Sequence, residues 1–243
     1  MNVEKAFSYP FEDKDWLSKL GLGAVISMVP ILNFAWYGYL VEIIRNVMHQ
    51  AAEPLPPWDD LGKKFNEGLT LFAAGLIYAS PILIAVCLLL TVILSSSLFS
   101  EHSNTQDIGE TMLQAGGALL YCLLCVLLLY GLVLSILHPA ILILFAREGT
   151  FASCFKLREA LDMIRKNVGP FFIAWALSVA ASLAAGLIVG FVNLVVSWIP
   201  CLGWIVGLAL GLASAAYSTA VYAHLFGQFG RTTLEGNQAV LLP

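Results

Sequence analysis

The sequence has few charged residues. Asp, Glu, Lys and Arg make up only 12% of its 243 residues, whereas a soluble domain has about 25%. Hydrophobic residues reach 59%, and the mean hydropathy is +0.84. Charged residues are absent from residues 68–100, 111–146 and 167–230, and each stretch is far longer than the roughly 18 apolar residues that indicate a membrane span. The composition excludes an ordinary soluble enzyme and predicts an all-α, polytopic helical membrane protein.

The sequence also lacks the motifs of most enzymes and cofactor sites. Its five cysteines are scattered, so they predict no disulfide framework and no metal site. Cys122 and Cys125 have the spacing of a redox motif, but they lie in a Leu-rich stretch, which favours a structural role. There is no Ser, His and acid arrangement and no glycine-rich phosphate loop. We therefore predict no enzyme activity, no catalytic residue, no cofactor, no bound metal and no nucleic-acid partner.

Proline and glycine divide the apolar stretches into spans. Residues 167–230 must cross the membrane more than once, and Pro200 with Gly203 predicts a tight hairpin between two helices. Pro81 and Pro139 each predict a kink inside a further span. The predicted spans are residues 68–98, 112–145, 170–198 and 204–228.

Residues 17–47 allow two interpretations. One continuous helix would be about 46 Å long, which is too long for a 30 Å hydrocarbon core without strong tilt. A turn at Pro30 and Asn33 instead gives helices at residues 18–28 and 34–48, which reach only about 17 and 22 Å. The sequence favours this short or re-entrant hairpin. On its second arm, Glu42 and Arg45 are spaced to form an ion pair.

A charged segment after the second span predicts a helix in the membrane interface at residues 151–168, with Thr150 as its cap. An Asp at position 59 or 60 is similarly placed to cap the helix that leads into the first span. The whole forms one predicted transmembrane domain, residues 1–231, followed by a C-terminal tail at 232–243. One face of the interfacial helix should be buried, either in the bilayer interface or against the bases of the neighbouring spans. That face consists of Cys154, Leu157, Leu161, Ile164 and Val168.

The basic residues indicate the topology. If the first hairpin is re-entrant or crosses twice, all twelve Lys and Arg residues lie on one side, which is then cytoplasmic and holds both termini. If residues 17–47 cross once, Lys5, Lys14 and Lys19 move outside. Both interpretations place residues 147–166 inside and the acidic connector at residues 100–111 outside.

Candidate binding residues fall on the predicted cytoplasmic surface. Arg and Lys side chains attract anionic lipid headgroups, while the aromatic side chains have the alternative role of anchoring the chain in the interface. The predicted lipid- or partner-binding surface consists of Trp58, Lys63, Lys64, Arg158, Arg165 and Lys166.

A second group of candidates lies inside the spans. His138 and His224 are ionisable, and ionisable residues in a membrane are functional candidates by default. Either they act as a proton relay or ligand, or each is a neutral imidazole hydrogen-bonded to a neighbouring carbonyl. Small residues four apart allow helices to pack closely, within the chain or against another copy or partner. These helix-packing glycines are Gly186, Gly190, Gly203, Gly207 and Gly211.

Several strings resemble one family. They are Ala6-Phe7-Ser8-Tyr9-Pro10-Phe11, Asp15-Trp16-Leu17, Pro30-Ile31-Leu32-Asn33, Leu55-Pro56-Pro57-Trp58-Asp59-Asp60-Leu61-Gly62, Pro139-Ala140 and Arg147-Glu148-Gly149-Thr150-Phe151. Over residues 3–231 the chain resembles the prokaryotic integral-membrane family known as domain of unknown function 4013. The Pro-Trp-Asp-Asp string is its most specific part. The resemblance implies a bacterial or archaeal protein of the inner membrane and carries over no catalytic residue.

We expect a non-enzymatic membrane protein that serves as a scaffold, assembly or accessory subunit of a membrane complex, or that organises lipids. Its expected partners are the lipid bilayer and either a protein partner or a second copy. The alternative is a transporter or permease for a small or amphipathic solute. Proline-kinked helices and repeat-like halves favour transport, whereas the scarcity of charge within the spans disfavours it.

Overall fold

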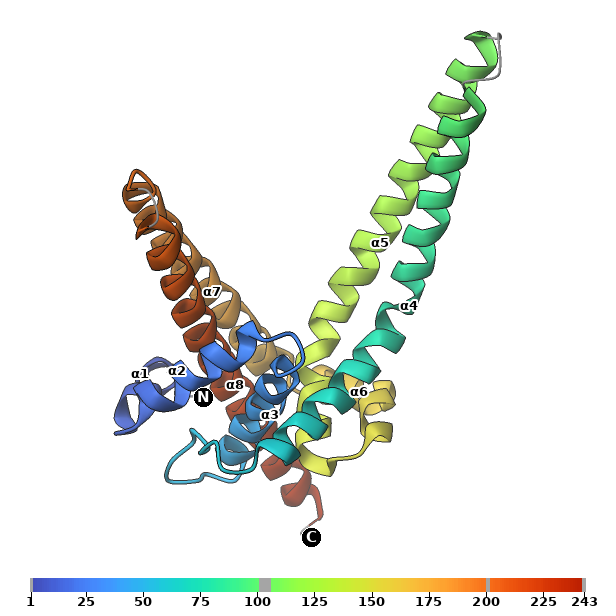
Figure 1. Cartoon of the computed structure of the whole chain (residues 1–243). Coiled ribbons are helices and arrows are strands. Elements are labelled where there is room, and N and C mark those ends of the chain that lie inside the picture. Colours follow the sequence, from blue (N-terminus) through green and yellow to red (C-terminus); the bar gives the residue numbers. More distant parts are fainter. Residues whose placement is uncertain (1, 101–105, 200–201, 242–243) are drawn as a thin grey trace. The chain divides into compact units, whose positions relative to one another are not determined.

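The described part of the chain is almost entirely helical (Figure 1). The computed structural model describes residues 2–100, 106–199 and 202–241, and no strand occurs among them. The predicted all-α fold class is confirmed. The helices are α1 Val3–Glu12, α2 Trp16–Met28, α3 Asn33–Met48, α4 Leu61–Ser100, α5 Gln106–Glu148, the short 3-10 helix η1 Phe151–Phe155, α6 Leu157–Lys166, α7 Val168–Val196 and α8 Leu202–Leu241.

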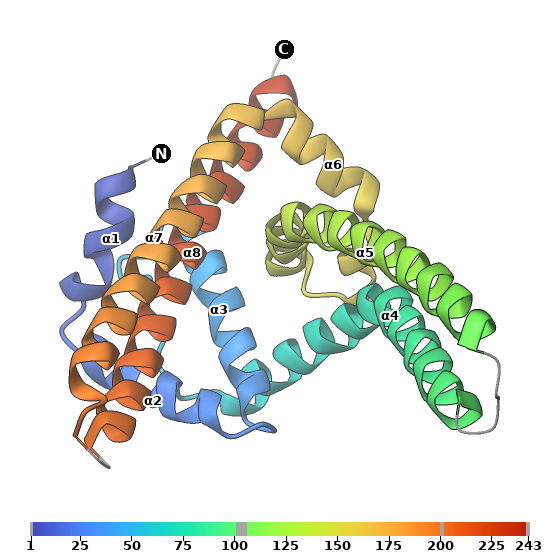
Figure 2. The same cartoon turned by 90° about the horizontal axis from the view of Figure 1, so that it is seen from above.

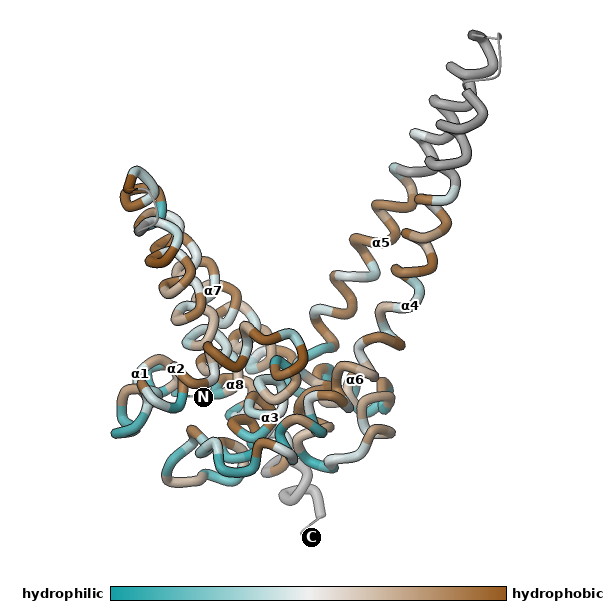
Figure 3. Tube along the Cα trace, viewed as in Figure 1, coloured by the Kyte–Doolittle hydropathy of each residue, from teal (hydrophilic) through white to brown (hydrophobic). Residues whose placement is uncertain are grey.

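Four of these helices are long and apolar enough to cross a membrane. The candidate spans are Leu61–Leu88, Tyr121–Glu148, Val168–Val196 and Gly203–Leu234. Hydrophobic colouring runs along all four in Figure 3, and hydrophilic colouring gathers at α1 and at the loop between α3 and α4. The four predicted spans are thus confirmed as long apolar helices. The residues expected to form a C-terminal tail are instead helical through Leu241, and the kinks at the two prolines stay predictions.

The chain divides into two compact units by its contacts, and the single predicted transmembrane domain stays a prediction. One unit comprises Met1–Phe72 and Leu137–Pro243, and the other is Ala73–Ile136. In the second unit, the Tyr130 hydroxyl of α5 donates to the Tyr78 carbonyl of α4 at 2.8 Å. In the first unit, α7 and α8 run side by side (Figure 2). Pro200 of the predicted hairpin turn, Cys201 and residues 101–105 of the acidic connector lie outside the described residues.

Residues 17–47 form two helices that pack against each other, as the hairpin interpretation requires. At 1.5 Å per residue, α2 is about 20 Å long and α3 about 24 Å. A helix that the sequence did not predict, α1, precedes them. The Asn2 side chain caps it by accepting from the Lys5 backbone N–H at 3.1 Å, and the Tyr9 hydroxyl fastens it to α8 by donating to the Ala220 carbonyl at 2.9 Å.

The core of the first unit surrounds the C-terminal half of α8. Phe226 and Phe229 are fully buried there, and α8 packs against α1, α2, α3 and α7. A Cβ at Gly227 would lie 2.6 Å from the Val47 Cβ, so glycine permits the close approach of α3. Each large apolar side chain buried here contributes about 1.5–3 kcal/mol. Helices α1, α2, α3 and α7 are therefore held around one central helix.

The predicted interfacial helix at residues 151–168 is wrong in its extent and its cap. The segment forms η1 and then α6, and Thr150 makes no side-chain cap bond. Instead the Thr150 carbonyl accepts from the Ser153 backbone N–H at 3.1 Å and from the Ser153 hydroxyl at 2.6 Å. Gly149 ends α5 with a φ of 65°, a left-handed conformation that favours glycine.

Most of the expected buried face of this segment is not buried against the protein. Ala160 and Met163 are the buried side chains of α6, whereas Leu157 is 37% exposed and Leu161 is 40% exposed. Of the five residues of that face, Cys154 alone is buried in protein contacts. Burial of the leucines in the bilayer interface stays a prediction.

Candidate functional site

Helices α3 and α4 cross with their backbones in contact at two glycines. A Cβ at Gly38 would meet the carbonyl of Lys64, and a Cβ at Gly68 would meet the carbonyl of Phe34. The crossing encloses the polar side chains beside it. We call Asp13, Lys19, Glu42, Arg45, Lys64 and Glu67 the polar cluster.

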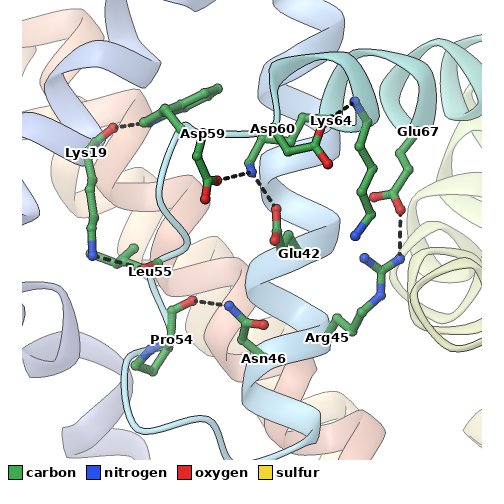
Figure 4. Close-up of polar contacts among 12 residues, drawn as sticks. Lys19, Glu42, Arg45, Asn46, Pro54, Leu55, Asp59, Asp60, Lys64 and Glu67 are labelled. Atoms are coloured by element: carbon green, nitrogen blue, oxygen red, sulfur yellow. Dashed lines mark hydrogen bonds and ion pairs between the residues drawn. The ribbon is translucent and has the colours of Figure 1, made fainter.

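Two ion pairs of the polar cluster join α3 to α4 (Figure 4). Lys64 Nζ lies 2.8 Å from Glu42 Oε2, and its side chain is only 2% exposed. Arg45 Nη2 lies 3.1 Å from Glu67 Oε1, while Arg45 Nε donates to the Ala146 carbonyl at 3.0 Å. The expected pairing of Glu42 with Arg45 is wrong, because each side chain finds an oppositely charged partner on the crossing helix.

Lys19 joins α2 both to the segment before it and to the loop that precedes α4. Lys19 Nζ lies 2.6 Å from Asp13 Oδ2 and donates to the Leu55 carbonyl at 3.2 Å. The loop is also fixed at Asn46, whose side-chain amide donates to the Pro54 carbonyl at 3.2 Å (Figure 4). These contacts make the loop part of the first unit's fold.

Trp58 lies inside this arrangement. Its indole N–H donates to the Lys19 carbonyl at 2.8 Å, and its ring stacks on Tyr39 with centroids 4.4 Å apart. The Tyr39 hydroxyl is buried and has no hydrogen-bond partner among the described residues. Burial, and then the nearby carboxylates of Asp13 and Glu42, raise the pKa of Tyr39.

The predicted lipid- or partner-binding surface is therefore only partly assembled. Lys64 is buried in an ion pair and Trp58 is engaged in packing, so neither offers the free cation or free ring that the prediction needs. Lys63 is exposed, and its backbone N–H bonds the Asp60 carboxylate at 3.2 Å, which confirms the predicted Asp cap. Arg158, Arg165 and Lys166 are exposed on one short helix, α6.

The charged residues just before α6 form ion pairs with one another and with Glu159 of that helix. Lys156 Nζ lies 2.6 Å from Glu148 Oε1, and this hydrogen bond raises the pKa of Lys156. Arg147 and Lys156 each lie 3.8 Å from Glu159. Arg158, Arg165 and Lys166 form no such pair within the described part of the chain, so their charges face outward.

Both candidate histidines have side-chain partners rather than the expected carbonyls. His138 Nδ1 lies 3.2 Å from the Tyr222 hydroxyl. His224 stacks on Tyr9, with centroids 4.3 Å apart, and its Nδ1 lies 3.0 Å from Gln228 Nε2.

The Gln228 contacts fix the protonation of His224 Nδ1. The Asn2 backbone N–H donates to Gln228 Oε1 at 2.7 Å, and Gln228 Nε2 donates to the Asn2 carbonyl at 2.9 Å. The amide nitrogen therefore also faces His224 as a donor, so Nδ1 accepts and carries no proton. This chain of bonds joins the start of α1 to α8, which is a structural task.

The five helix-packing glycines do not act together. Gly207 packs against the Asn193 side chain of α7, and Gly203 lies close to the backbone of Ser197 at the end of α7. Gly186, Gly190 and Gly211 have open space where a Cβ would lie. Helices approach closely at Gly38, Gly68 and Gly227. The sequence did not predict these contacts, because none of the three glycines has another glycine four residues away.

Cys154 offers a test of the packing beneath η1. Burial raises the pKa of its thiol to about 11, so only about one thiol in ten thousand is thiolate at pH 7. In a variant whose other cysteines are serine, we expect maleimide labelling of the folded protein to rise about tenfold per pH unit up to pH 10. In detergent-unfolded protein the rate should level off near pH 9, since a free thiol has a pKa of about 8.5. A labelling rate at pH 7 as fast in the folded protein as in the unfolded protein would contradict the buried placement.

Within the described residues no three His, Cys, Asp or Glu side chains are placed to hold a metal ion. The four cysteines Cys87, Cys122, Cys125 and Cys154 form no disulfide. The polar cluster thus consists of mutually paired charges, whereas Arg158, Arg165 and Lys166 of α6 carry charges that face outward.

Comparison with known proteins gives one match. The model of a family described as a protein of unknown function, DUF4013, matches residues 22–194. No curated protein and no solved structure matches the chain.

Proposed function

The chain belongs to the DUF4013 family of proteins of unknown function, and we propose that it is a non-enzymatic membrane protein that binds anionic lipid headgroups through α6. The observation that carries the proposal is the exposure of Arg158, Arg165 and Lys166 beside exposed Leu157 and Leu161. Each basic side chain near an anionic membrane surface contributes about 1 kcal/mol.

The three faces of α6 support this role. Ala160 and Met163 pack against the protein. At 100° per residue, Leu157 and Leu161 lie on a neighbouring face, and Arg158 and Arg165 lie on a third. A helix with an exposed apolar face and a basic face lies in the membrane interface, with its leucines toward the acyl chains and its cations toward the headgroups.

The hydroxyl groups inside the spans support a role other than transport. Ser80, Ser135 and Ser178 each donate to the carbonyl three residues earlier in their own helix, at 2.7–2.8 Å. Ser182 donates to the Ser178 carbonyl at 2.9 Å. These hydroxyls satisfy the helix backbone, as polar groups in a bilayer must, so they favour lipid-facing or packing helices over a polar path for a solute.

The termini support one common side for the basic residues. Asn2 is bonded to Gln228, so the start of α1 and the late part of α8 lie on the same side of the membrane. By the positive-inside rule, we propose that this side is cytoplasmic and that the protein resides in a prokaryotic inner membrane. The lipid surface on α6 then faces the inner leaflet.

The test replaces Arg158, Arg165 and Lys166 together by Gln. The full-length protein is reconstituted in nanodiscs of phosphatidylcholine with phosphatidylglycerol, and retained lipid is counted by native mass spectrometry. Three cations at about 1 kcal/mol each predict a fall in the preference for phosphatidylglycerol of about a hundredfold, and salt should weaken the parent's preference.

The matched control replaces Lys5, Lys14 and Lys63 by Gln. These lysines are also exposed, so the net charge changes equally while α6 is untouched. The control variant should keep the parent's preference for phosphatidylglycerol. An equal loss in both variants would mean that net charge alone attracts the lipid, and no loss in either would reject α6 as a lipid site.

A further inference from the structure

One face of α2 is exposed, apolar and without charge. The exposed residues of α2 that lie within about 140° of one another around the helix are Leu17, Ser18, Gly21, Leu22, Val25 and Met28. The other side of the helix, with Leu20, Gly23 and Ile26, is buried against the protein. Exposed single apolar residues are ordinary, but a continuous apolar face on one helix marks an interaction surface.

The turn after α2 continues this surface. Val29, Ile31 and Leu32 are all exposed large apolar residues, with Ile31 at 68% exposure. The ion pair of the hairpin lies at the end away from the turn. There Lys19, near the start of α2, pairs with Asp13. The hairpin therefore has a polar base and an apolar tip.

The hairpin is held rigidly from its protein side. Residues of α3 are buried around most of the helix, including Tyr39, Val41 and Ile43. A Cβ at Gly23 of α2 would overlap the Trp36 side chain of α3, so the two arms are in close contact. The apolar face is thus presented by a fixed element and is not a loose segment that can fold away.

We propose that the outer face of α2 and the turn at residues 29–32 insert into the acyl chains of a single membrane leaflet, and that α3 returns to the same surface. At about 20 and 24 Å, neither arm reaches across a hydrocarbon core of about 30 Å. An uncharged apolar face with a polar base is the pattern of an element that enters from one interface. The occupant of the surface is the acyl region of the lipid, and this inference does not depend on headgroup binding by α6.

The experiment measures membrane depth with spin labels on the full-length protein in liposomes. Single cysteines replace Val25, Ile31, Lys14 or Glu53 in a variant whose native cysteines are serine. Labels at Val25 and Ile31 should collide with oxygen and be protected from a water-soluble nickel complex, and Ile31 should be the deeper of the two. Lys14 and Glu53, which are exposed polar positions at the two ends of the hairpin, should show the reverse.

A second measurement fixes the side on which each end lies. An impermeant thiol reagent should label Lys14→Cys and Glu53→Cys from one side and Ser197→Cys, at the end of α7, from the other. Labelling of the first two from opposite sides would show that the hairpin crosses, which overturns the proposal. Protection of Val25 and Ile31 from both oxygen and nickel would mean that protein covers the face, and free access of nickel would mean that water does. Either result rejects insertion, while the lipid preference of α6 is measured separately.

Discussion

Gly68→Ala is expected to be among the most destabilising single substitutions in this chain, and Gly38→Ala should be similar. An added Cβ at either position meets a backbone carbonyl of the crossing helix, Phe34 in one case and Lys64 in the other. A side chain could rotate away, but a helix backbone moves only if α3 and α4 separate. Overpacking costs about 1–3 kcal/mol and occasionally more, and we expect about 3 kcal/mol here. The apparent melting temperature in detergent should fall by about 6–12 °C.

Gly62→Ala and Gly75→Ala are the matched controls, since both lie on α4 with no atom within 4 Å of an added Cβ. Alanine is favoured over glycine inside a helix by about 0.5–1 kcal/mol, so both controls should be neutral or slightly stabilising. All four variants carry the same Gly→Ala change, yet the two pairs should change stability in opposite directions. If Gly68→Ala has the same melting temperature as its controls, α3 and α4 do not cross in contact at this point.

The elements that the sequence predicted well are those whose signal is local. Pro30 and Asn33 interrupt an apolar run, and the structure has α2 and α3 on either side of them. The long spans follow from the absence of charge. By contrast α1 was missed because Pro10 lies within it, although its stability comes from tertiary bonds such as that of Tyr9 to Ala220.

The polar cluster was missed for a different reason. Lys63 and Lys64 are adjacent in sequence and look equivalent, yet they point about 100° apart on a helix. One is exposed and the other is buried beside Glu42. Which of them is enclosed depends on where α3 crosses α4, and that crossing is set by single glycines with no repeated spacing. The side of α6 that packs against the protein, with Ala160 and Met163, was also not predicted, because the break after η1 changes the helical phase without a strong sequence signal.

Lys64→Met should destabilise the protein by about 3 kcal/mol. The Lys64 ammonium is 2% exposed and lies 2.8 Å from Glu42 Oε2, whereas the Glu42 side chain is 22% exposed. Removing one partner of a buried ion pair typically costs about 3–5 kcal/mol, because the other charge is left without compensation. The partial exposure of Glu42 lets water screen its charge, which favours the lower end of that range. The free energy of unfolding in mixed micelles, or the melting temperature, measures the effect.

Lys63→Met controls for the loss of one lysine at the start of α4, and because Lys63 is exposed its stability should stay within about 0.5 kcal/mol of the parent. The double variant Glu42→Leu with Lys64→Met removes both charges and keeps side chains of similar volume, so it should recover much of the loss. Substitutions at residues in direct contact change stability non-additively, and the recovery in the double variant would show that Glu42 and Lys64 interact. If Lys64→Met is as stable as Lys63→Met, or if the double variant is less stable than the sum of its single changes, the ion pair does not hold α3 to α4.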